Sequence, residues 1–178
     1  MRDQFLSWLG GLCLCLGIAS GCDTYTEVEY LHMETVDRWG TPSAAKSAYK
    51  PFSWEGVATV PDVLRRSDTE HNIVLRFYAD GPRTVFVRAV RLSGANNQVY
   101  VSPLFAKEQS RELSEPLSKG GRTGLIALTD EIKNTALDAL AASGSIQLEV
   151  EVKMSPTGQY TTLRYNLRRR VITKWATH

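Results

Sequence analysis

The chain has little of what most catalytic and metal sites need. Its histidines, His32, His71 and His178, are scattered and form no HxH or HxxxH pair, which gives metal binding little support. There is no Gly-x-Ser-x-Gly elbow for a nucleophilic serine. The stretch 120–122 (Gly-Gly-Arg) lacks the glycine spacing and the lysine-serine pair of a phosphate-binding loop. The sequence therefore predicts no catalytic residue, no metal ligand and no cofactor.

Cysteine is also scarce, and an excess of charge of one sign is absent. All three cysteines fall within residues 11–23, and none follows. The 178 residues have a formal net charge of +2, with 43% hydrophobic and 22% charged residues, which is the composition of an ordinary globular domain. This balance gives no general attraction to nucleic acid, and no nucleic-acid partner is expected.

The first 21 residues have the parts of a secretory signal peptide. Arg2 gives a weak positive start that Asp3 partly offsets, and an uncharged stretch then runs over residues 4–21. Its apolar centre, FLSWLGGLCLCLGI, is short and interrupted by glycine, whereas a spanning helix needs about 20 mostly apolar residues. The small residues Ala-Ser-Gly at 19–21 close the stretch, as a signal peptidase requires.

The stretch Ile18-Ala19-Ser20-Gly21-Cys22 resembles the lipobox of bacterial lipoproteins. The resemblance implies cleavage before Cys22, a diacylglyceryl group on its thiol and an acyl chain such as palmitate on the new amino terminus. Cys13 and Cys15 each follow a leucine and do not fit, while Ala19 stands where leucine is commonest. Ordinary cleavage nearby, or a signal-anchor with an incidental cysteine, are the alternatives.

Several acyl chains, at ~0.8 kcal/mol per buried CH₂, would anchor the protein stably in a membrane. We therefore expect a protein of the bacterial cell envelope that is lipid-anchored and faces the periplasm. Asp23 slightly favours the inner membrane. Cleavage removes Arg2 and Asp3 together, so the mature side-chain charge stays at +2, and a single remaining cysteine allows no intrachain disulfide.

We divide the chain into a signal peptide (1–21), a lipidated N-terminus (22–53) and a β-rich globular domain (54–178). The N-terminal part contains a possible first strand at 24–31 and a tether at 34–53. A strand is expected at 54–60, ending at Pro61. The segments 72–79, 84–92 and 98–105 predict a three-strand meander, with a bulge near Arg88-Ala89 that turns both halves of the second strand inward. Residues 106–124 are polar and glycine-rich and predict a solvated loop.

A helix is expected near 130–142. Thr129 can cap its start, Gly144 follows its end, and Ile132, Ala136 and Leu140 recur every four residues with Leu137 beside them. Residues 145–154 alternate apolar and polar side chains, and 160–175 return antiparallel. Because sixteen extended residues reach over ~50 Å, we expect a bend or bulge near residues 168–170.

These elements predict a mainly β fold, an antiparallel β-sandwich or partial barrel with one helix. The layout resembles the immunoglobulin-like or transthyretin-like modules of periplasmic lipoproteins. Four basic residues share one side of the last strand: Arg164, Arg168, Arg170 and Lys174. They predict either a charge ladder with Glu149 and Glu151, or a surface for an acidic partner or for anionic lipid headgroups.

The predicted function is a non-catalytic, lipid-anchored periplasmic binding or structural module that holds a protein partner at the envelope. The alternatives are a hydrolase of envelope polymers, which needs titratable groups converging in a cleft, and a carrier of a lipid or small apolar ligand, which needs an apolar cavity.

Overall fold

The computed structural model describes residues 24–32, 52–94, 97–117 and 121–175. The expected signal peptide, Cys22 and most of the expected tether lie outside these residues. No helix within the described segments is long and apolar enough to cross a membrane.

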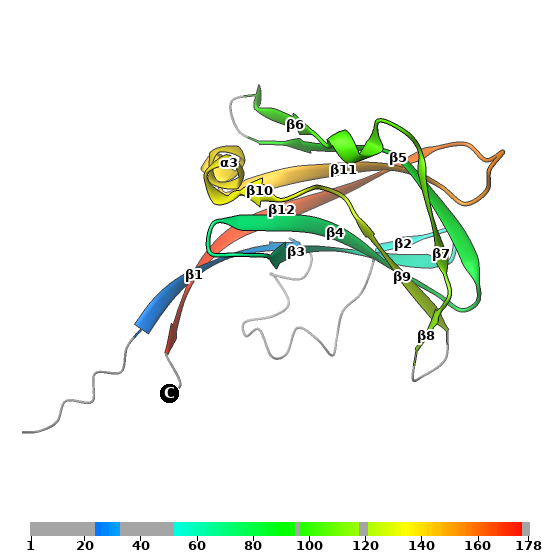
Figure 1. The fold of residues 1–178 in the computed structure, drawn as a ribbon, viewed down its shortest axis with the longest axis horizontal. Helices are drawn as coiled ribbons and strands as arrows, with labels where there is room; N and C mark the ends of the chain where they lie inside the picture. Colours follow the sequence, from blue (N-terminus) through cyan, green and yellow to red (C-terminus); the bar gives the residue numbers. More distant parts are fainter. Residues whose placement is uncertain (1–23, 33–51, 95–96, 118–120, 176–178) are drawn as a thin grey trace, which may run out of the picture.

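Two antiparallel six-stranded sheets make up the fold, and the prediction of a mainly β antiparallel architecture with one short helix is confirmed (Figure 1). Sheet A consists, in spatial order, of β1 (Thr24–His32), β12 (Thr161–Trp175), β11 (Ser145–Lys153), β5 (Arg83–Ser93) and β6 (Val99–Val101), with β7 (Gln109–Leu113) also paired to β5. Sheet B consists of β2 (Phe52–Trp54), β3 (Val57–Arg65), β4 (Glu70–Ala79), β9 (Arg122–Ala127) and β8 (Glu115–Pro116), with β10 (Ile132–Lys133) also paired to β4. The described residues also form the α-helix α3 (Asn134–Leu140) and the 3₁₀ turns η2 (Pro103–Phe105) and η3 (Ala141–Ser143).

The core lies between the inner faces of the two sheets. In β11, Ile146, Leu148, Val150 and Val152 are completely buried, as the alternation predicted, because every second side chain of a strand points to the same face. A hydrogen bond joins the sheets across this core, between Thr59 Oγ1 on β3 and Tyr165 Oη on β12, at 2.6 Å.

The predicted meander is wrong in its first pairing. The turn at Asp80-Gly81-Pro82 carries the chain from β4 in sheet B to β5 in sheet A, and these two strands do not pair. A turn signal specifies a reversal of the chain but not which strands form the ladder. The second expected pairing, β5 with β6, does form.

The expected bulge in β5 is confirmed. Glu151 lies opposite Ala89 while Val152 lies opposite Val87, so Arg88 is the extra residue. On both sides of it the apolar side chains face the core, and Val85, Val87, Val90 and Leu92 are all buried.

The expected loop at 106–124 is instead largely strand, because β7, β8 and the start of β9 fall within it. Within this segment, Leu113 at the end of β7 is completely buried. Polar residues fit here because these short strands lie at the sheet margins, where much of each side chain reaches solvent.

The expected stop at Pro61 is also wrong, because β3 continues to Arg65. Since β2 pairs only with Val57–Thr59, the missing N–H of Pro61 removes no hydrogen bond between β2 and β3.

The helix begins later than predicted. The Thr129 hydroxyl accepts a hydrogen bond from the Ile73 backbone N–H at 3.0 Å rather than capping a helix, and Ile132 belongs to β10. The buried side of the helical segment consists of Leu137, Leu140 and Ala141, whereas Ala136 is exposed. Gly144 ends the segment at φ +91°, as expected for a left-handed C-terminal position.

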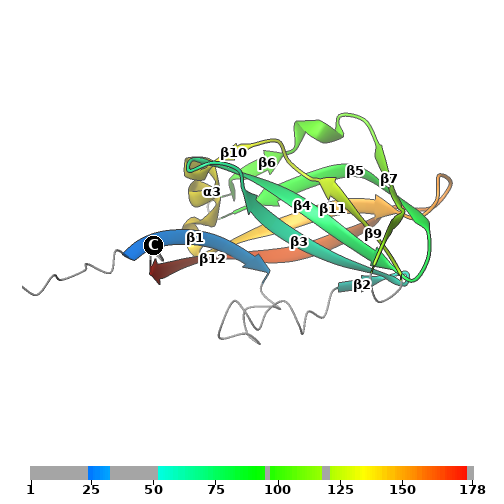
Figure 2. The ribbon, with the colours of Figure 1, turned by 60° about the horizontal axis from the view of Figure 1, so that its bottom comes forward.

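The last strand runs without the expected bulge near residues 168–170. Its register is continuous with β11 over Thr161–Arg168 and with β1 over Leu167–Trp175. Fifteen residues fit into one strand because its second half leaves the sandwich. Beyond the start of β11, β12 pairs only with β1, and the two strands project together as a ribbon (Figures 1 and 2). We call this part, Thr24–Glu29 with Arg170–Trp175, the β1–β12 ribbon.

Candidate functional site

The candidate surface is the side of sheet A that faces away from the core, on which the predicted residues Arg164 and Arg168 lie. Its residues alternate with the buried ones on β5, β11 and β12 and continue onto β6. We call its central part, together with β6, the outer face of sheet A: this part consists of Arg88, Ala89, Arg91, Ser93, Val99, Val101, Gln147, Glu149, Glu151, Thr162, Arg164, Asn166 and Arg168.

Cross-strand ion pairs form in the centre of this face. Arg164 Nε lies 2.9 Å from Glu149 Oε1, and Arg88 Nε contacts Glu151 Oε2. Both arginine side chains are at least half exposed, at 64% and 50%. The predicted charge ladder is therefore present at these two pairs, and each contributes little to stability because the charges remain in contact with water.

Other guanidinium groups on or next to this face have no carboxylate partner among the described residues. Arg91 and Arg168 are exposed, and neither makes an ion pair or side-chain hydrogen bond. Arg170, half-buried at the base of the ribbon, follows on the same side of β12, with Glu29 opposite it in the register, and likewise makes no ion pair. Lys174 pairs with Tyr25 in the register of β1 and β12.

Two of the four predicted residues, Arg164 and Arg168, therefore lie on one surface. Arg91 was missed, although it lies in one register row with Glu149 and Arg164. Only the pairing of β5 with β11 reveals this row. Beside Arg91, Val99 and Val101 are 45% and 66% exposed, which adds an apolar margin on β6.

A compact cluster of cationic and aromatic side chains lies at the other end of the face. Lys153, only 8% exposed, forms an ion pair with Glu108 at 2.9 Å, and its ammonium lies 4.7 Å from the centre of the Tyr160 ring. The Arg88 guanidinium stacks at 3.8 Å over the same ring. Next to this cluster is a surface hollow of about 380 Å³, lined by Pro82, Arg83, Thr84, Phe86, Glu112, Met154 and Pro156.

Arg169 has the opposite orientation to its neighbours and holds the ribbon against the helix. Its Nε donates to Asp138 Oδ1 at 2.7 Å, and the Tyr30 hydroxyl donates to the same oxygen at 3.0 Å. Burial, reinforced by the hydrogen bond to the Asp138 carboxylate, raises the pKa of the Tyr30 hydroxyl. The hydrogen bond to Asp138 likewise raises the pKa of Arg169. We call these three residues the Tyr30–Asp138–Arg169 contact.

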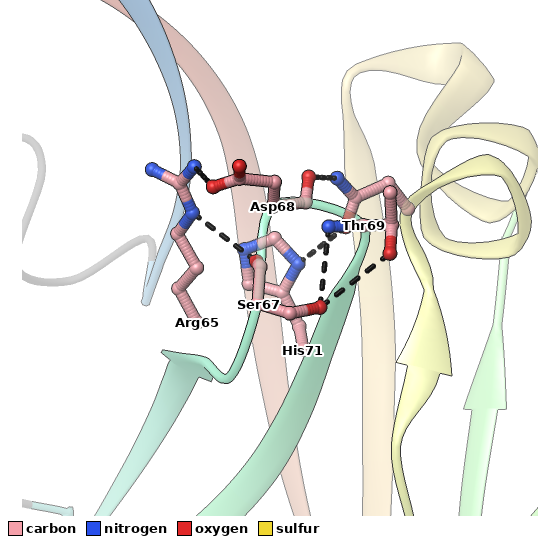
Figure 3. A network of polar contacts seen from close by, with 6 residues as sticks. Arg65, Ser67, Asp68, Thr69 and His71 are labelled. Atoms are coloured by element: carbon pink, nitrogen blue, oxygen red, sulfur yellow. Dashed lines mark hydrogen bonds and ion pairs between the residues drawn. The ribbon is translucent and has the colours of Figure 1, made fainter.

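His71 is buried and is also held by structural contacts. Its ring packs edge-on against Tyr30 with centroids 6.0 Å apart, and its Nδ1 lies 2.7 Å from Asn134 Oδ1. Asn134 Nδ2 donates to the Asp68 carbonyl, so Oδ1 accepts and the proton belongs on His71 Nδ1. Figure 3 shows His71 beside the β3–β4 turn, where Arg65, Ser67, Asp68 and Thr69 bond to one another. No three histidine, cysteine or carboxylate residues of the described chain are placed to hold a metal ion.

Comparison with known proteins assigns no family. No family model matches the chain, and no curated protein matches it. Among solved structures, a crystal structure of a protein from Archaeoglobus fulgidus is 12% identical and aligns over 70% of this chain and 100% of its own length, with a TM-score of 0.32. A similarity at this level gives no basis for assigning a function.

Proposed function

We propose that the chain is a non-catalytic, lipid-anchored periplasmic module that holds an acidic protein partner at the bacterial envelope, with the outer face of sheet A as its docking surface. The observation that carries the proposal is that Arg91 and Arg168 are exposed on the outer face of sheet A and make no ion pair with another described residue. That sheet also contains β1, the strand that follows the expected lipidation site.

The expected anchor is close to the folded part of the chain. Cys22 is two residues before Thr24, the first residue of β1, and two extended residues span at most about 7 Å. Because β1 is paired along its whole length to β12, a lipid on Cys22 would hold the sandwich through the β1–β12 ribbon rather than through the long tether expected over 34–53. The Tyr30–Asp138–Arg169 contact supports the base of this ribbon.

The charge of the face favours an acidic partner. Four arginines lie on this central part against two glutamates, so its net charge is +2, and Arg91 and Arg168 have no ion pair with another described residue to break before binding. Arginine is prominent among the residues that dominate binding energy, and complementary charge accelerates association. The apolar margin at Val99 and Val101, and the hollow beside Phe86, offer contacts for apolar side chains of the same partner.

The test is covalent crosslinking in native membranes with the full chain, comparing Arg91→Glu/Arg168→Glu with a matched charge reversal at the exposed Lys133 of β10. We expect one crosslinked partner with an acidic surface, lost in the double variant and retained in Lys133→Glu. Equal recovery from both variants, or a partner that depends on Lys133, would refute the docking face.

The anchor is tested separately by the mass of the N-terminal peptide. A peptide that begins at Cys22 and carries acyl chains, together with loss of Cys22→Ser from the membrane fraction, is expected. An unmodified Cys22 in a membrane-free protein would overturn the anchor while leaving the docking test intact.

A further inference from the structure

The edge of β12 that faces away from β1 is open over the last part of the strand. Along Thr161–Arg168 this edge pairs with β11, but from Arg170 to Trp175 no described strand other than β1 pairs with β12. The two strands of the β1–β12 ribbon project from the sandwich together (Figure 2). A ribbon of two strands has little stability of its own in water, and an open edge is a template for a further strand.

The backbone groups on this open edge follow from one hydrogen bond. The Arg169 N–H donates to the Gly144 carbonyl at 3.0 Å, so the backbone groups of Arg169 point away from β1. Backbone groups alternate between the two edges of a strand, so those of every second residue after Arg169 point the same way. These residues are Val171, Thr173 and Trp175. The residues between them direct their N–H and C=O groups to β1.

Little in this stretch protects the open edge from another strand. It contains no proline, and the register of β12 with β1 is continuous, so no bulge turns the edge away. Its central residues, Val171, Ile172 and Thr173, are β-branched and favour a strand, and the Val171 side chain is 52% exposed. These are the properties of an edge that accepts a further strand.

The ribbon is suited to pairing with a second copy of itself. Its charged residues sum to zero, and they are Glu27, Glu29, Arg170 and Lys174. Two ribbons therefore do not repel each other through net charge. An antiparallel pair centred on Thr173 would place Thr173 opposite its own copy and Val171 opposite Trp175, so that every open backbone group meets a partner. Lys174 would lie opposite Ile172, and no two like charges would be directly opposite.

We propose that two copies of the chain pair through the open edges of β12, related by a two-fold axis at Thr173. The product is a four-stranded antiparallel sheet, made of β1 and β12 of one copy followed by β12 and β1 of the other. The contact uses the backbone groups of Val171, Thr173 and Trp175 and does not use the outer face of sheet A. It depends neither on the acidic partner proposed above nor on the lipid anchor.

The test compares two proline variants of the full chain in detergent micelles by light scattering, which gives the mass of protein in each complex. Thr173→Pro removes an N–H from the open edge and no hydrogen bond of the ribbon, so it should convert the dimer to a monomer. The matched variant is Thr26→Pro, because Thr26 lies opposite Thr173 in the register and its N–H points away from β12. This variant adds a proline on the other edge of the ribbon and should leave the dimer intact.

Hydrogen exchange in the unmodified chain tests the same contact without a substitution. In the dimer, the N–H groups of Val171 and Thr173 should exchange at least about tenfold more slowly than that of the exposed Thr26 on the other edge. The proposal is overturned if the unmodified chain is a monomer at every protein concentration, or if Thr26→Pro dissociates the dimer and Thr173→Pro does not. An N–H of Thr173 that exchanges as fast as that of Thr26 would overturn it as well.

Discussion

Replacement of Asp138 tests whether the β1–β12 ribbon is fixed to the sandwich. Asp138 Oδ1 receives both the Tyr30 hydroxyl, at 3.0 Å, and Arg169 Nε, at 2.7 Å, so one carboxylate links β1, β12 and α3. In Asp138→Ala the buried Tyr30 hydroxyl loses its carboxylate acceptor and Arg169 loses its counter-charge. We therefore expect a less stable protein with a loosened ribbon.

The two contacts are expected to contribute different amounts to the free energy of unfolding. A hydrogen bond from the buried Tyr30 to a carboxylate is worth about 1.5–3 kcal/mol, whereas the pair with Arg169, whose side chains are 32% and 44% exposed, adds at most about 1 kcal/mol. Alanine is the better helix former by up to about 0.7 kcal/mol, which offsets part of the loss. The net cost should be about 2 kcal/mol.

Urea denaturation measures this cost, and a double-mutant cycle with Tyr30→Phe separates the contact from helix propensity. The coupling energy should be about 1–2 kcal/mol. Asp138→Asn, which keeps an acceptor for Tyr30 but removes the charge, should cost about 1 kcal/mol. Hydrogen exchange should accelerate over Thr24–His32 in Asp138→Ala more than over β11. A coupling energy below about 0.5 kcal/mol, or unchanged exchange in β1, would refute the reasoning.

Three further predictions concern stability. The pKa of Tyr30 is higher in the folded than in the unfolded chain, so the unfolded tyrosine ionises first and the protein should lose stability as the pH rises above about 10. Urea denaturation from pH 8 to 11 should show that the free energy of unfolding falls less steeply with pH in Tyr30→Phe. Tyr165→Phe should lower the free energy of unfolding by about 1–3 kcal/mol, and adding Thr59→Val should recover part of that loss, since both ends of the inter-sheet bond are then apolar. A double variant that loses more free energy of unfolding than the two single variants together would contradict this. Gly94→Ala places a Cβ against the backbone carbonyl at the end of α3 and should lower the free energy of unfolding by more than about 2 kcal/mol. In Gly81→Ala the new Cβ meets nothing within 4 Å, so the change should be close to neutral. Equal melting temperatures for the two variants would show that the packing at Gly94 is not tight.

The strands that alternation marks most clearly are found from the sequence, because burial on one face imposes a period of two. This holds for β11 and for the inward side of β5 with its bulge at Arg88. The method fails at β7 and β8, where marginal strands are polar on both sides, and at Ile132, whose spacing fits a helix although the residue pairs with His71 on β4.

By itself the sequence determined the mainly β class, several of the places where the chain turns, and the common side of Arg164, Arg168 and Arg170 on the last strand. These properties depend on local geometry, namely turn residues and the alternation of side chains along one strand. Only the tertiary structure decided that β4 and β5 belong to different sheets, that Arg91 joins the row of Arg164, and that from Arg170 onward β12 pairs with no described strand other than β1. Such relations arise between segments far apart in the chain, and their free energy depends on which strand edges meet, which no local pattern specifies.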